Sequence, residues 1–558
     1  MASPHRALFS IVTFAAGSVL LAWSPAPQEA PEGYAIANEK VIDRCSRCHV
    51  VDDDGRMSRI SYLRKTPEGW QTSIRRMMAL HGARLNQADA TEIVRYLANE
   101  QGLAPEELRP GMFEVERRSL DHDYEGDSGV EYTCIQCHSM GRVITQRRTG
   151  EEWSLLLATH RGLYPLVDRQ AFRNGGRGGP DSGPHPMDEA IDHLSEVFPL
   201  ETPEWSAWSA TKRSPRLAGT WTLAGHEPGK GPIFGTVTII ADPGDPDAFT
   251  TSTAYVYAES GQRVQRTGRS AIYTGFQWRG RSNPGAEDEL REVMLVERGQ
   301  SEISGRWFRG DYDEVGPDVT LRRVSGGAVV SGVYPMALEK GVATDVQVFG
   351  LGLTSSSELD FGAGITVEST NAGTDGSLRV RVSVMANANL GARDVYSNGS
   401  IAERAVVVHD GVDRIGITPE TGLARAGGVV HPKGYQAFDA IGYDNGPDGE
   451  PNTDDDLNLG RVAVSWHLEE YAATFGDDDI DFVGHIGTDG VFVPAVDGPN
   501  PERSGLRNNI GDVWVVATLG DGGALSARAH LVVAPPLYMR WEPWREIESG
   551  RPPIGDER

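Results

Sequence analysis

The spacing of hydrophobic residues divides the chain into a helical first part and a β-rich remainder. Between residues 86 and 100, Ala90, Ile93, Val94 and Leu97 recur at helical intervals and predict an amphipathic helix. Asn86 is suited to cap the start of this helix. We expect residues 31–200 to form one mainly helical domain. Its predicted helices cover residues 34–45, 67–80, 86–100, 105–120, 150–159 and 186–198.

After Pro215 the helical spacing is replaced by short runs of alternating apolar and polar residues, separated by Gly, Pro and Asp clusters. This alternation predicts strands, and residues 215–326 are expected to form an antiparallel, barrel-like domain. Its predicted strands cover residues 219–223, 233–240, 249–258, 270–274, 292–297, 302–308 and 319–323.

Two further strand-rich units follow, over residues 329–410 and 411–538. Their size and turn spacing predict two Ig-like β-sandwiches, although neither has the Cys…Trp…Cys core of antibody domains. Residues 539–558 are expected to form a C-terminal tail. The predicted fold class is therefore multidomain, with a helical domain followed by three all-β domains.

The four cysteines of the chain all belong to two C-x-x-C-H motifs, Cys45–His49 and Cys134–His138. This motif is the attachment signature of c-type haem. Cys45 and Cys48 would bind one porphyrin covalently, Cys134 and Cys137 a second. In each motif the adjacent histidine, His49 or His138, would be the proximal iron ligand. A disulfide, a thioredoxin-like redox pair and a zinc site are weaker readings of the same cysteines.

The helical domain contains an internal repeat that suggests the distal ligands. A Pro67–Trp70 segment follows the first motif, and a Gly150–Trp153 segment follows the second. Seven residues after the two tryptophans stand Met77 and His160, and Met and His are the usual sixth ligands of haem iron. We predict His49/Met77 for the first haem and His138/His160 for the second. The competing residues are Met57, Met78 and His81 in the first half, and His185, Met187 and His193 in the second. Met140 is too close to His138 to reach around the ring.

The N-terminus predicts export from the cytoplasm. Residues 1–6 are basic, residues 7–23 are apolar, and residues 24–30 are small or polar, as in a signal peptide over residues 1–30. An uncleaved anchor is the alternative, but the apolar run is short for a full span and contains Ser10, Thr13 and Ser18. Covalent haem attachment takes place outside the bacterial cytoplasm, so we expect a periplasmic protein that is not integral to the membrane.

The net charge and the remaining motifs further restrict the possible functions of the chain. A formal net charge of -26 argues against a nucleic-acid partner. The acidic loop Asp444–Asp456 has oxygen ligands at a spacing that suits Ca²⁺, but it lacks the EF-hand pattern, and an acidic surface hairpin is the competing reading. No G-x-S-x-G, Walker or H-E-x-x-H motif is present, so no catalytic residue is predicted.

Taken together, the two haem motifs, the Trp70…Met77 and Trp153…His160 pairs and the three β domains resemble the α (dihaem) subunit of bacterial quinohaemoprotein amine dehydrogenase over nearly the whole chain. The resemblance implies a periplasmic heterotrimer with a propeller-type β subunit and a small γ subunit that carries a quinone. It implies that this chain relays electrons from the quinone to an external acceptor, such as a cytochrome or a blue-copper protein, during the oxidative deamination of primary amines. The alternatives are a free-standing dihaem cytochrome c shuttle and an Ig-domain scaffold with structural haems.

Overall fold

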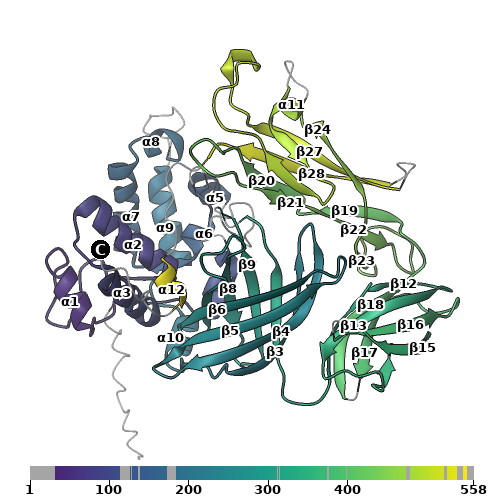
Figure 1. Cartoon of the computed structure of the whole chain (residues 1–558). Helices are drawn as coiled ribbons and strands as arrows, with labels where there is room; N and C mark the ends of the chain where they lie inside the picture. The colour runs from purple at the N-terminus through teal and green to yellow at the C-terminus, as the bar shows by residue number, and fades with distance from the viewer. Residues whose placement is uncertain are drawn as a thin grey trace, which may run out of the picture.

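A helical domain lies against one side of a central β-barrel, and two further β units follow on the other side (Figure 1). The computed structural model describes residues 32–113, 126, 128–135, 138–172, 184–310, 312, 314–373, 376–397, 399–472, 478–520, 525–536 and 544–549. The structure therefore confirms a multidomain chain with a helical first domain and mainly β structure after it.

The helical domain begins at α1 (Glu39–Cys45), which starts five residues later than predicted because Asn38 caps it by accepting a hydrogen bond from the Val41 amide. The long helices α2 (Pro67–His81), α3 (Gln87–Glu100), α7 (Gly150–Leu163) and α9 (Pro186–Val197) lie within a few residues of their predicted positions. Asn86 caps α3 as expected, since its side chain accepts from the Asp89 amide at 2.8 Å.

The segment predicted as one helix over residues 105–120 is instead a short helix, α4 (Pro105–Leu108), followed by the 3-10 turn η1 (Arg109–Gly111). Residues 114–120 of that prediction lie outside the described residues. The remaining short helices were not predicted, because each is too short to show a hydrophobic period. They are α5 (Ser128–Cys134), α6 (Gly141–Ile144), α8 (Val167–Gln170) and α10 (Pro203–Ser209).

Two short strands join the halves of the helical domain. β1 (Leu63–Lys65) and β2 (Gln146–Arg148) pair antiparallel, with Arg64 opposite Arg147. Each strand leads directly into the helix that carries the repeat tryptophan, α2 or α7. The sequence repeat is thus also a structural repeat, with the equivalent strands meeting at its centre.

Residues 219–323 form a closed barrel of eight antiparallel strands, one more than the alternating pattern predicted. The missed strand is β7, whose sequence QWRGRS shows no apolar alternation. The strands are β3 (Gly219–Glu227), β4 (Gly231–Asp242), β5 (Asp245–Tyr257), β6 (Arg263–Tyr273), β7 (Gln277–Ser282), β8 (Leu290–Val296), β9 (Glu302–Phe308) and β10 (Asp318–Arg323).

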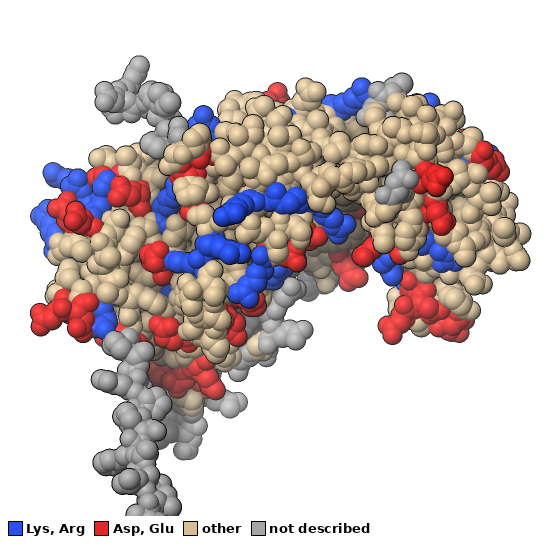
Figure 2. Space-filling view, turned by 90° about the horizontal axis from the view of Figure 1, so that it is seen from below, with Lys and Arg blue, Asp and Glu red and all other residues tan. Residues whose placement is uncertain are grey.

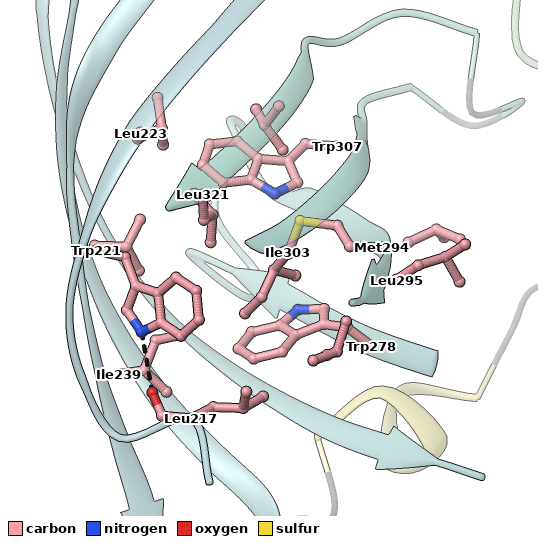
Figure 3. Close-up of a cluster of buried hydrophobic side chains, with 14 of the residues drawn as sticks. Leu217, Trp221, Leu223, Ile239, Trp278, Met294, Leu295, Ile303, Trp307 and Leu321 are labelled. Atoms are coloured by element: carbon pink, nitrogen blue, oxygen red, sulfur yellow. Dashed lines mark hydrogen bonds between the residues drawn. The ribbon is translucent and has the colours of Figure 1, made fainter. Parts of the chain in front are cut away.

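Large apolar side chains fill the barrel. Trp221, Trp278 and Trp307 point into it together with leucine, isoleucine and methionine side chains (Figure 3). The Trp221 indole N–H donates to the Leu217 carbonyl at 3.0 Å, so this buried polar group is satisfied. The interior of the barrel is a packed core that supports the neighbouring domains.

The next unit contains two four-stranded sheets around a shared apolar core that includes Val348, Val382 and Val406. One sheet holds β11 (Val329–Tyr334), β13 (Ala343–Leu351), β16 (Leu378–Val384) and β15 (Ile365–Ala372). The other holds β12 (Ala337–Glu339), β18 (Ser400–His409), β17 (Gly391–Ser397) and β14 (Leu359–Asp360).

The last β unit is built from three sheets around a second core, which includes Phe438, Phe492 and Leu531. Its strands are β19 (Arg414–Thr418), β22 (Asp439–Asp444) and β23 (Leu457–Arg461); β20 (Thr421–Arg425), β28 (Leu525–Ala534), β27 (Gly511–Leu519) and β24 (Ser465–Glu470); and β21 (Gln436–Ala437), β26 (Val491–Pro494) and β25 (Gly484–Ile486). A single turn of helix, α11 (Asp479–Phe482), precedes β25. Both units are strand-rich as expected, while their assignment as Ig-like remains a prediction.

The chain ends, within the described residues, on a short helix that returns to the helical domain. This helix, α12 (Arg545–Ser549), is packed between the helices and the barrel (Figure 1). In the part of the chain that the structure describes, no helix has the length and apolar character needed to cross a membrane. The face in Figure 2 shows basic side chains gathered over the middle of the molecule and acidic ones mostly toward its edges, so the net negative charge is unevenly spread.

Candidate functional site

The first C-x-x-C-H motif forms a tight turn at the end of α1. Cys45 is the last residue of the helix, and its carbonyl accepts hydrogen bonds from the Cys48 amide at 3.1 Å and the His49 amide at 3.0 Å. Both cysteines and the histidine are therefore held on one turn, as attachment to a single porphyrin requires. The second motif begins in the same way, because Cys134 ends α5. Cys137 lies outside the described residues.

No disulfide joins the described cysteines, Cys45, Cys48 and Cys134. Burial raises the pKa of Cys45 to about 11, and the neighbouring Cys48 adds to the rise. Burial also raises the pKa of Cys134 to about 11. A redox-active pair needs a lowered thiol pKa, so these environments argue against the thioredoxin-like reading.

The structure places the predicted ligands His138 and His160 beside each other. Their ring centroids are 6.3 Å apart, with 49° between the ring planes. Because an imidazole nitrogen binds a metal ion at about 2 Å, two rings on opposite sides of one ion have centres about 6 Å apart. The observed separation therefore fits a single iron between the two histidines.

Each of the three predicted histidine ligands is oriented by a backbone carbonyl. Nδ1 of His49 lies 2.8 Å from the Ser58 oxygen, Nδ1 of His138 lies 2.9 Å from the Ser139 oxygen, and Nδ1 of His160 lies 2.8 Å from the Leu156 oxygen. A carbonyl only accepts, so Nδ1 carries the proton and Nε2 keeps its lone pair for a metal. Burial lowers the pKa of His138 to about 4, which also favours the neutral, ligating form.

Met77 occupies the same helix face in the first half as His160 does in the second. On α2, Trp70 and Ile74 are buried in the core, and Met78 packs against the same cluster, whereas Met77 is half-buried and not part of it. On α7, Trp153 and Leu157 fill the equivalent core positions, and His160 follows on the other face. Within the described part of the chain the structure records no direct contact between His49 and Met77, so this pair stays a prediction.

The supporting residues of the two helices also repeat. Thr66 and Thr149 cap α2 and α7 through their side-chain oxygens. The ammonium of Lys65 lies over the Trp70 ring at 5.8 Å, and the guanidinium of Arg148 lies over Trp153 at 5.6 Å. Both indole N–H groups donate to a carbonyl at 3.1 Å, that of Gln101 for Trp70 and that of Phe198 for Trp153. Met77 and His160 are thus carried on equivalent frameworks.

Most of the competing ligands have structural roles. Met57, Met140 and Met187 are buried in the hydrophobic cores. His185 caps α9, since its Nδ1 accepts from the Met187 amide at 3.1 Å. His81, in the last turn of α2, is exposed, and His193 is half-buried.

Exposed apolar side chains lie close in sequence to both haem motifs. Seven large apolar residues next to the motifs and near the ends of α2 and α7 are between 37% and 74% exposed. A contiguous patch of such side chains is typical of a surface that binds an apolar group. A porphyrin held at each motif would be such a group. The residues are Val50, Leu80, Tyr132, Ile135, Leu163, Tyr164 and Leu166.

The acidic loop Asp444–Asp456 gives the calcium prediction no support. Its carboxylates accept backbone amide hydrogen bonds within the turn, as Asp444 does from Gly446 at 2.8 Å and Asp448 from Glu450 at 2.8 Å. Asp456 pairs with Arg414. Among the described residues, the structure shows no group of three or more His, Cys, Asp or Glu side chains placed to hold a metal ion.

Four protein-family models match consecutive parts of the chain. The first, described as "Quinohemoprotein amine dehydrogenase A, alpha subunit, haem binding", matches residues 35–205. Models for domains II, III and IV of the same alpha subunit match residues 214–324, 328–410 and 415–544. The models therefore cover most of the chain in the order of its domains.

Comparison with curated proteins gives no match. Among solved structures, a redesigned β-barrel is similar to 20% of this chain and 92% of its own, with 13% identity and a TM-score of 0.17. A glucan-binding protein of Bacteroides ovatus is similar over 58% of this chain and 68% of its own, with 10% identity and a TM-score of 0.17. Both likenesses are too weak to carry an argument.

Proposed function

The chain belongs to the quinohaemoprotein amine dehydrogenase α-subunit family, and we propose that it is the dihaem electron-transfer subunit of such an enzyme. In this role it relays electrons from a quinone cofactor on a partner subunit to an external acceptor, such as a cytochrome or a blue-copper protein. The overall reaction is the oxidative deamination of primary amines.

The approach of His138 and His160, with ring centroids 6.3 Å apart, is the observation that best supports this proposal. We assign Cys45 and Cys48 to the thioether bonds of one haem c, and Cys134 and Cys137 to those of a second. His49 and Met77 would ligate the first iron, and His138 and His160 the second.

When bound, each haem would supply an iron that accepts and releases one electron at a time. The residues of the chain hold that iron and set its potential. Carbonyl hydrogen bonds at Nδ1 fix the imidazoles, and the exposed apolar side chains next to the motifs would pack against the porphyrins. A methionine ligand favours a higher potential than a second histidine. This difference would direct electrons from the second haem to the first.

The quinone belongs on another subunit in this proposal, because every cysteine of the chain lies in a haem motif. The partners are a propeller-type β subunit and a small quinone-bearing γ subunit. Residues 1–30 act as a signal peptide that directs the protein to the periplasm, where haem is attached.

Intact mass spectrometry and haem staining after denaturing electrophoresis test the proposal. The mature chain should carry the mass of two haems and stain after denaturation. The Cys134→Ala variant should keep the first haem and lose normal attachment of the second. A mass that fits one haem or none in the wild-type chain would contradict the assignment.

A further inference from the structure

The C-terminal segment 544–549 lies far from the haem motifs in sequence but beside α2 in space (Figure 1). Ile547 is fully buried and belongs to the same core cluster as Trp70 and Ile74 of α2. The Tyr273 hydroxyl of β6 donates to the Ile547 carbonyl at 2.6 Å. The segment therefore packs between the wall of the barrel and α2, the helix that carries Met77.

Buried charges tie the segment to the first turn of α2. Glu548 is fully buried and pairs with Arg281 of β7 and Arg291 of β8. Arg291 also lies 3.2 Å from Glu68 at the start of α2, and Arg279 donates to Glu68 at 2.5 Å. One arginine therefore links a carboxylate of the C-terminal segment to a carboxylate of α2. Removing one member of such a network leaves its partners buried and underpaired.

The segment also contacts the middle of α2. The Trp544 amide donates to Gln71 Oε1 at 3.0 Å. The Arg75 guanidinium lies 5.1 Å from the centre of the Trp544 ring, a cation–π distance. Gln71 and Arg75 are one helical turn apart, so Trp544 contacts two successive turns of α2 in the direction of Met77.

We propose that residues 544–549 are a positioning element that holds α2, and through it Met77, at the first haem. The proposal rests on the proposed function, because it takes Met77 as the distal ligand. A distal ligand must stay within bonding distance of its metal, and the contacts that support it determine how well it does so. The contacts described above join the segment to the first half of the helical domain and to the barrel, so the second haem serves as an internal control.

Two truncations of the haem-loaded full-length protein test this inference. One ends after residue 543 and removes the segment, and the matched control ends after residue 549 and keeps it. The first should weaken the methionine–iron charge-transfer band and lower the midpoint potential of the first haem. The second haem should keep its potential, and the control that ends after residue 549 should behave as the wild-type protein does.

Hydrogen exchange gives a readout that does not depend on the haem ligands. Without residues 544–549, the amides of α2 should exchange at least about tenfold faster, while those of α7 should not change. If the truncated protein does not fold, Ile547→Ala provides a milder change. Ile303→Ala is its matched control, because Ile303 is equally buried but lies in the barrel core.

The outcomes separate the two proposals. Unchanged exchange in α2 after removal of the segment would overturn the positioning role. Faster exchange with an unchanged charge-transfer band and potential would overturn it as well, because α2 would then move without consequence for the haem. A wild-type protein whose spectrum shows no methionine ligand would instead refute the ligation given under the proposed function.

Discussion

At the residue scale, the direction in which a side chain points separates the predicted ligands from their neighbours. Met77 and Met78 are adjacent in sequence, yet Met78 packs on the core cluster and Met77 does not. The helical repeat of 3.6 residues per turn places consecutive side chains about 100° apart, so only one of the two can face the core. The same geometry places His160 beside His138, away from the core formed by Trp153 and Leu157.

Replacing Met77 tests this reading directly. Met77→Ala should abolish the methionine–iron band of the oxidised protein and lower the potential of one haem, because a methionine ligand raises it. Met78→Ala is the matched control; it should lower stability through lost packing and keep the band. Visible spectroscopy and redox titration measure both effects. A band that survives in Met77→Ala and disappears in Met78→Ala would reverse the assignment.

A buried carboxyl in the barrel wall should make stability depend on pH. Burial raises the pKa of Glu292 from 4.5 to about 7, although the Trp278 indole N–H donates to its carboxyl at 2.9 Å. In the folded state the group stays protonated at pH values where the unfolded chain has lost the proton. Stability should therefore fall as pH rises between these values, by at most about 1.4 kcal/mol per pH unit from this group.

Glu292→Gln removes that titration and keeps the shape of the side chain. Its unfolding free energy, measured by chemical denaturation between pH 4.5 and 8, should fall less steeply with pH than that of the wild-type chain. At pH 8 the variant should be the more stable of the two. Parallel pH profiles would show that Glu292 is not the group responsible.

At the element scale, arginines from β1 and β2 bind the same carboxylate, that of Glu107. The Arg64 guanidinium, on β1, donates to both oxygens of Glu107 at 2.7 and 2.8 Å, and Arg147, on β2, lies 3.1 Å from the same carboxylate. Burial by itself would raise the pKa of Glu107, but hydrogen bonds and charge from the two arginines hold it below its usual value. Glu107 thereby joins the two halves of the repeat.

Glu107→Ala should destabilise the helical domain by about 3–5 kcal/mol, because two arginines would remain buried without their shared carboxylate. Asp168→Ala is a suitable control, since the Arg161–Asp168 pair has a similar distance, 2.8 Å, but is exposed. Its effect should be far smaller. The unfolding free energies of both variants are measured by chemical denaturation, with haem absorbance as the signal. If the two variants lose the same amount of stability, the Glu107 network contributes little.

At the scale of the whole molecule, the barrel is the common support. The helical domain contacts the barrel through Glu68, which pairs with Arg279, and through the C-terminal segment. In the β unit of residues 329–410, the ring of Phe349 stacks on Phe234 of the barrel. In the last β unit, Asp439 pairs with His226 of the barrel. Such a frame can present the haem domain and the β domains to partner subunits in a fixed arrangement. A free electron shuttle needs no frame of this size, which favours the role of a subunit.

The isolated chain, with both haems attached, should accept electrons from a chemical reductant but should not oxidise primary amines. Removing two electrons and a proton from an amine needs a carbonyl-type cofactor and a base, and the quinone cofactor is proposed to lie on a partner subunit. Addition of the quinone-bearing and propeller subunits should give amine-dependent reduction of both haems, followed by visible absorbance. Amine-dependent reduction by the isolated chain would contradict the relay role.

The sequence by itself determined the features that depend on local spacing. The helical stripe identified α3, and the Trp-anchored repeat singled out His160, which lies beside His138 in the structure. The motifs supplied the proposed haem cysteines and histidines. Each of these signals lies within a few turns of the chain. Tertiary structure decided what depends on distant partners. β7 is a strand because it pairs with β6 and β8, and Glu68 of α2 neutralises its buried Arg279. Within the expected tail, residues 544–549 pack against the barrel, where Glu548 pairs with Arg281 and Arg291. The acidic loop was ambiguous in sequence, and its carboxylates turned out to bond to its own backbone and to Arg414. A charged residue is stable in the interior only with a partner, and that partner cannot be identified from nearby sequence.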